Sequence, residues 1–159
     1  MLEKLVALHR NLVELLREEY VHMGAADLKG IGETAHAKEV LLGEIWNLEQ
    51  LRISSTEKLA GSFAIAKEDA TLALIADRLP RAEGDKLRII RKALNLLCEQ
   101  AKEANVRNMS FAESSLERIE TLKRNVLGIS NTATKENYSN AGTRQPIADQ
   151  GGRLLSTEA

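Results

Sequence analysis

Residues 87–111 read LRIIRKALNLLCEQAKEANVRNMSF, and mostly small or apolar side chains recur along them at alternating intervals of three and four. This spacing is that of a heptad repeat, which turns one side of an α-helix toward a partner helix. We therefore expect a long helix over residues 85–129, with Asp85 as its N-cap. The repeat positions are Leu87, Ile90, Leu94, Leu97, Ala101, Ala104, Asn108 and Phe111.

The repeat changes phase after Phe111. Intervals of four, four, three, four and three lead on to Ser115, Ile119, Leu122, Val126 and Ile129. Two successive intervals of four form a stutter, which locally relaxes a left-handed supercoil. At about 1.5 Å per residue the helix would be about 65 Å long, which is more than a compact domain of this size requires. The pattern therefore predicts an elongated molecule.

Two more long helices and a short one are expected upstream, because leucines there recur at the same intervals. Asp27 is suited to be an N-cap, and Pro80 would stop the short helix. The long last helix has only these helices to pack against. We predict an all-α fold, an elongated antiparallel helical bundle or coiled coil of three long helices with a short connecting helix. The expected upstream ranges are 2–23, 27–60 and 68–79.

Residues 130–159 differ in composition from the helical domain, which we expect to cover residues 1–129. They are rich in Ser, Thr, Asn, Gly and Gln and contain few large apolar side chains. Such a segment buries too little apolar surface to offset the entropy lost on ordering. We expect it to be a flexible polar tail.

The overall composition argues against several classes of protein. The 22 Lys and Arg residues balance 23 Asp and Glu, for a net charge of −1, so the chain lacks the positive charge that nucleic-acid binding needs. No signal peptide is recognisable, and no apolar run is long enough for membrane insertion. We expect a cytoplasmic protein in which Cys98, the only cysteine, is a small buried residue.

Two Glu-x-x-His pairs, Glu19 with His22 and Glu33 with His36, form the one pattern that suggests an enzyme. A di-metal helical bundle uses two such pairs together with an inward Glu from each of two further helices. The chain has one other long helix, whose repeat positions are mostly apolar. We therefore expect both pairs, and His9, on exposed helix faces, with no metal, cofactor or catalytic residue. We interpret Trp46 as part of the bundle packing.

The last predicted helix offers a more specific surface. Asn108 lies in the apolar repeat, where a buried amide can fix the register of helices, and Asn105 lies one turn earlier. A solvated bend would explain the two asparagines equally well. Further along, Leu116, Ile119, Leu122, Val126 and Leu127 supply more apolar surface than one seam needs. The two earlier helices are shorter, and uncovered apolar surface of this kind marks a binding site for an amphipathic helix of another chain.

Taken in order, several features resemble the FlgN-type flagellar type III export chaperones for hook-associated proteins. The resemblance covers most of the chain and lies in the combination, since none of the features is a catalytic signature. It departs in the tail, because residues 143–159 continue past Tyr138 and have no counterpart in the pattern. The features are Leu15-Leu16-Arg-Glu-Glu19, Asp27-Leu28, Lys38-Glu-Val-Leu-Leu42 with Leu48 and Arg52, the 72–80 segment, Asn105-x-x-Asn108, and Tyr138 shortly before Gly142.

The resemblance implies a cytosolic helical chaperone that binds the C-terminal region of hook–filament junction proteins. It would keep these clients from assembling early and deliver them to the export apparatus, without hydrolysing nucleotide. Tyr138 would dock on the cytoplasmic domain of the export gate. A structural coiled-coil adaptor that self-associates through the same face is the alternative, and self-association of the client-free chaperone is left open. The implied client-binding residues are Asn105, Asn108, Phe111, Leu116, Ile119, Leu122, Val126 and Leu127.

Overall fold

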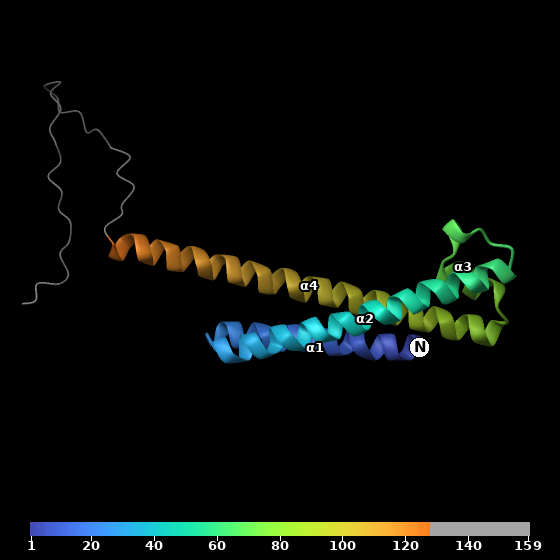
Figure 1. Ribbon diagram of the computed structural model, residues 1–159, viewed down its shortest axis with the longest axis horizontal. Coiled ribbons are helices and arrows are strands. Elements are labelled where there is room, and N and C mark those ends of the chain that lie inside the picture. The colour runs from blue at the N-terminus through green and yellow to red at the C-terminus, as the bar shows by residue number, and fades with distance from the viewer. Residues whose placement is uncertain (128–159) are drawn as a thin grey trace, which may run out of the picture. The chain divides into compact units, whose positions relative to one another are not determined.

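The computed structural model describes residues 1–127, and all regular structure in them is helical (Figure 1). The predicted all-α class is therefore confirmed. The chain divides into two compact units, Met1–Ala112 and Glu113–Ala159, with the boundary inside the last helix. The segment 130–159, expected to be a flexible tail, lies outside the described residues. The elements are α1 (Leu2–Gly24), α2 (Leu28–Ser62), the 3-10 helix η1 (Lys67–Asp69), α3 (Leu72–Arg78) and α4 (Arg81–Val126).

Helices α1 and α2 form an antiparallel hairpin. Two ion pairs show the direction: Lys4 lies 3.7 Å from Glu44, and Glu19 lies 2.6 Å from Lys38, so residue numbers rise along α1 as they fall along α2. The helices end one and two residues beyond the predicted ranges.

The turn between α1 and α2 is fixed by Asp27. Its Oδ1 accepts a hydrogen bond from the Gly30 amide at 3.1 Å, which confirms the predicted N-cap. This bond, together with a hydrogen bond from the His22 ring at 2.9 Å, holds the pKa of Asp27 below its ordinary value. The chain reverses through Ala26 in the left-handed region, with φ 53°.

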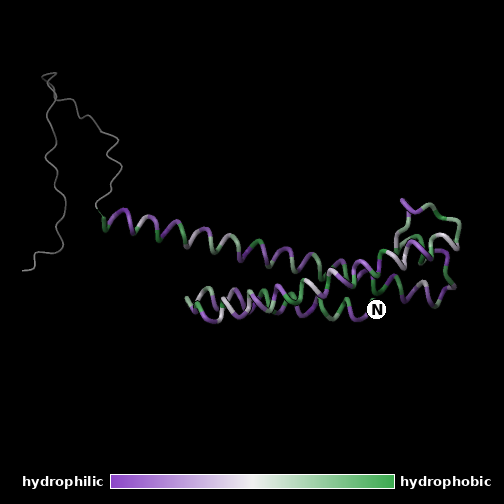
Figure 2. Tube along the Cα trace, in the orientation of Figure 1, coloured by the Kyte–Doolittle hydropathy of each residue, from purple (hydrophilic) through white to green (hydrophobic). Residues whose placement is uncertain are grey.

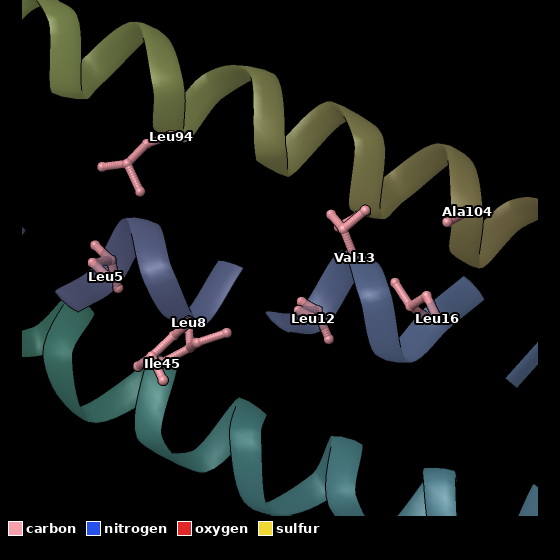
Figure 3. Close-up of a cluster of buried hydrophobic side chains, with 9 residues drawn as sticks. Leu5, Leu8, Leu12, Val13, Leu16, Ile45, Leu94 and Ala104 are labelled. Carbon is pink, nitrogen blue, oxygen red and sulfur yellow. The ribbon is translucent and has the colours of Figure 1, made fainter. Parts of the chain in front are cut away.

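The first part of α4 packs on the hairpin and completes the core of residues 1–112. Asn108 Nδ2 donates a hydrogen bond to the Leu16 carbonyl at 2.8 Å, while Leu94 lies over the Leu5 end of α1 (Figure 3), so α4 runs in the same direction as α1. The heptad positions of α4 face this core, as the spacing predicts. The buried core consists of Leu5, Leu8, Leu12, Val13, Leu16, Ile45, Leu94, Ala101 and Ala104.

The connection into α4 differs from the prediction. In place of one helix over 68–79 there are η1 and the seven-residue α3. Helix α4 begins at Arg81, because the Pro80 carbonyl accepts hydrogen bonds from the Glu83 and Gly84 amides at 3.0 and 2.9 Å. The predicted N-cap at Asp85 is therefore wrong. Asp85 lies inside the helix, where its carboxylate binds Arg88 at 2.8 Å.

Gly84 is not a helix breaker but a point of close approach between α3 and α4. It is buried, and a Cβ atom there would overlap the carbonyl oxygen of Ala76. A main-chain oxygen cannot swing away as a side chain can, so only glycine lets the two helices come this close.

Gly84→Ala should therefore lower the free energy of unfolding by about 1–3 kcal/mol, even though alanine is the better helix former. Gly32→Ala is the matched control, since Gly32 is exposed inside α2 and a Cβ there meets no atom within 4 Å. The control should be neutral or stabilising by up to about 1 kcal/mol. Urea unfolding of both variants measures the difference, and equal changes would contradict the close approach.

Candidate functional site

The apolar stripe of α4 changes from buried to exposed along the helix. At about 100° per residue, the stripe positions of residues 87–108 and those after Ala112 fall on the same side of α4. Leu94, Ala101 and Ala104 are buried, whereas the apolar residues of the stripe within 113–127 are 58% to 83% exposed. These exposed residues are called the late-helix face below, and they are Leu116, Ile119, Leu122, Val126 and Leu127.

The late-helix face is the apolar side of an amphipathic helix. Its five side chains cover an arc of about 140°, and Figure 2 shows hydrophobic positions alternating with hydrophilic ones toward the end of α4. Lys123 falls within the same arc, and the flank of the arc beside Leu127 carries Glu120 and Arg124, whose side chains lie 3.4 Å apart. An apolar strip of this width between charged residues matches the apolar side of another helix.

Asn105, Asn108 and Phe111, which were also expected to contact a client, are placed differently. Asn105 is exposed. Asn108 is only 4% exposed and donates to the Leu16 carbonyl at 2.8 Å and to Glu19 Oε2 at 3.0 Å. This arrangement supports the register-fixing role for Asn108 and does not support the solvated bend. Phe111 is half-buried.

A polar network beside Asn108 was not recognised in the sequence. Glu19 is buried, with 9% of the residue exposed. Its carboxylate accepts hydrogen bonds from Lys38 Nζ at 2.6 and 2.8 Å and from Asn108 Nδ2 at 3.0 Å. One carboxylate thus joins α1, α2 and α4. The spacing offered a signal, because Glu19 follows Leu5, Leu8, Leu12 and Leu16 on the same side of α1.

Aromatic contacts lie one turn beyond this network. The rings of Tyr20 and Phe111 meet edge to face, with centroids 5.4 Å apart and an interplanar angle of 67°. The Arg107 guanidinium lies 5.0 Å from the centroid of the Tyr20 ring. Both contacts are of the favourable kind for aromatic pairs and for a cation over a ring. They fix α4 to α1 near the end of the first unit.

Several single-residue predictions are wrong. His9 is buried rather than solvated, and its Nδ1 lies 2.8 Å from the Leu5 carbonyl. Trp46 is 66% exposed and is not part of the bundle packing. Cys98 is exposed rather than buried. The pKa of the Cys98 thiol is nevertheless raised, mainly by partial desolvation and less by the charges of Glu49 and Glu99. A raised pKa disfavours the reactive thiolate.

The Glu-x-x-His pairs do not converge. Glu19 is engaged with Lys38 and Asn108, so its predicted exposure is wrong, and His22 binds Asp27 at 2.9 Å. Glu33 and His36 are exposed on α2. Within residues 1–127 no group of three or more His, Cys, Asp or Glu side chains could hold a metal ion. Tyr138, the expected docking residue, lies outside the described residues.

Comparison with known proteins identifies the family of the chain. None of the helices in residues 1–127 has an apolar run that could cross a membrane. Searches of curated proteins and of solved structures found no match. The sequence model described as "FlgN protein", in contrast, matches residues 1–146, which is most of the chain. The chain therefore belongs to the FlgN family, whose members are flagellar export chaperones.

Proposed function

We propose that this protein binds the C-terminal helical region of hook-associated proteins in the cytoplasm through the late-helix face. Binding there would prevent these clients from assembling early and would hold them for delivery to the flagellar type III export apparatus. The observation that carries the proposal is the late-helix face itself, an apolar stripe that continues the core-forming side of α4 and is exposed from Leu116 to Leu127. Family membership supports the chaperone role.

The expected mode of binding is a client helix laid along α4. Each apolar side chain transferred from water contributes about 25 cal/mol per Å² of buried area, and the entropy of association offsets much of that gain. A strip of five apolar residues therefore suits an intermediate affinity. Intermediate affinity is what export requires, because the client must be released at the export apparatus.

Titration of the full-length protein with a purified C-terminal fragment of a hook-associated protein tests the proposal. We expect a complex of one chain with one fragment in light scattering, with heat of binding in calorimetry. A stable homodimer that ignores the fragment would instead identify a self-associating coiled-coil adaptor, and would overturn the proposal.

Tyr138 is the residue we propose for docking on the cytoplasmic domain of the export gate, on the strength of its position in the family pattern. Tyr138→Ala should weaken binding to the purified gate domain by about tenfold, since loss of a contacting aromatic ring commonly removes more than about 1 kcal/mol. Tyr138→Phe, which keeps the ring, is the control and should retain most of the affinity. Client affinity should be the same in both variants. Unchanged gate affinity in Tyr138→Ala would contradict this role.

A further inference from the structure

The two-helix hairpin has a second groove, on the side away from α4. Val13 of α1 points toward α4 (Figure 3), and Asn11 and Leu15 each lie about 160° from it around the same helix. There α1 and α2 border a shallow hollow of about 520 Å³ that is open to solvent. Its lining residues follow one another on each helix at the spacing of a single helix face, positions 11, 14, 15 and 18 on α1 and positions 37, 40, 41 and 44 on α2. We call this hollow the α1–α2 groove.

The floor of the α1–α2 groove is apolar. It is formed by Leu15 of α1 and by Val40 and Leu41 of α2, with Ala37 leaving space beside them. Val40 is 54% exposed. Val21 on α1 and Leu51 on α2 lie beyond opposite ends of the hollow, because the two helices are antiparallel, and they are 67% and 56% exposed.

The walls of the groove are acidic. Glu14 and Glu18 stand on α1 and Glu44 on α2, and no basic residue lines the groove. Glu14 binds Arg17 of its own helix at 2.7 Å, and Glu44 lies 3.7 Å from Lys4, with both members of each pair exposed. Among the described residues Glu18 has no ion-pair partner. Exposed ion pairs of this kind are weak, so a cation brought by another molecule finds carboxylates on both walls.

We propose that the α1–α2 groove binds an amphipathic helix of a partner protein, with an apolar stripe flanked by Lys or Arg. A groove between two helices is best filled by a third helix, whose side chains pack between the rows of side chains on the first two. The apolar floor selects apolar residues spaced by three and four, and the acidic walls select basic flanks and repel acidic ones. This site uses other residues than the late-helix face, so it does not depend on the proposed client binding.

Two synthetic peptides of about 18 residues serve as probes. They share one leucine stripe and differ only in carrying Lys or Glu at the flanking positions. Fluorescence anisotropy with the full-length protein should show the Lys peptide binding at least about tenfold tighter than the Glu peptide. Glu14→Lys combined with Glu18→Lys should reverse this preference. The matched control is Glu99→Lys with Glu103→Lys, which makes the same change of charge at exposed positions of α4 and should preserve the preference.

Several results would overturn the proposal. Equal affinities for the two peptides, or no measurable binding, would show that the groove does not select a helix by its charge, as the proposal requires. If Glu14→Lys with Glu18→Lys and the α4 control both lose the preference for the Lys peptide equally, general attraction of opposite charges would explain the binding. Loss of peptide binding in Leu122→Asp with Val126→Asp, but not in the groove variant, would move the site to the late-helix face. If the wild-type chain forms a homodimer and Glu14→Lys with Glu18→Lys dissociates it, the occupant of the groove would be a second copy of this chain.

Failure of this inference is distinguishable from failure of the proposed function. Affinity for the hook-associated fragment should be the same in the wild-type chain and in Glu14→Lys with Glu18→Lys. Circular dichroism of each variant checks that the helices are retained, which the exposed positions of these side chains favour.

Discussion

Lys38→Met should destabilise the protein by about 3 kcal/mol, the lower end of the range for breaking a buried ion pair. Lys38 supplies the charge that compensates Glu19, whose side chain is 11% exposed. Methionine keeps the length and apolar stem of lysine but offers no hydrogen-bond donor. The Glu19 carboxylate would then lose both hydrogen bonds from Lys38 Nζ while still accepting one from the Asn108 amide. Urea unfolding measures the change.

Lys4→Met is the matched control for this prediction. It removes the same chemical group from the same hairpin, but Lys4 and Glu44 are 62% and 51% exposed and 3.7 Å apart. An exposed pair contributes less than about 1 kcal/mol. Equal losses in the two variants would show that the Glu19–Lys38 pair is no more important than a surface pair. A third variant, Glu19→Leu with Lys38→Met, should recover much of the stability, because it leaves no uncompensated charge.

Leu122→Asp combined with Val126→Asp should weaken client binding by about a hundredfold or more. Burial of a large aliphatic side chain contributes about 1.5–3 kcal/mol, and two carboxylates placed in an apolar contact would add a desolvation penalty. Leu122 and Val126 are 62% and 83% exposed, so the fold should be unaffected. Calorimetric titration with the hook-associated fragment measures the loss, and circular dichroism checks the helix content.

Thr121→Asp with Asn125→Asp provides the control for the late-helix face. These positions are exposed, have the same spacing of four, and lie on the opposite side of α4 at about 100° per residue. The control adds the same two charges one residue earlier in the chain and should leave client affinity within about threefold of the wild type. Client binding that survives the first pair of substitutions, or fails equally in both, would place the client elsewhere.

Much of the candidate site was open to prediction because it depends on one periodicity. The intervals of three and four from Leu87 to Val126 identify one side of a helix, and the structure places that side against the core as far as Asn108. Asn108 itself illustrates the limit. Its position in the repeat is visible in the sequence, but its partners, the Leu16 carbonyl and the Glu19 carboxylate, belong to residues about 90 positions away along the chain.

The errors share one physical cause. A helix period tells which residues share a face, but not how many neighbouring helices approach that face or from which direction. Helix α1 is covered on two sides, so its buried strip widens beyond the leucines to include His9 and Val13. Helix α2 carries apolar residues on several faces, and only the face with Ile45 is buried, so Trp46 next to it is left exposed.

The sequence by itself determined the helical class, the long heptad stripe of α4 and the cap at Asp27, because each depends on groups within a few turns of one helix. Only the tertiary structure decided that Gly84 allows α3 and α4 to meet, and that Glu19 joins three helices. It also decided that one groove of the hairpin is filled by α4 while the acidic one stays open. These features depend on distances between separate helices, which the spacing within one helix does not encode.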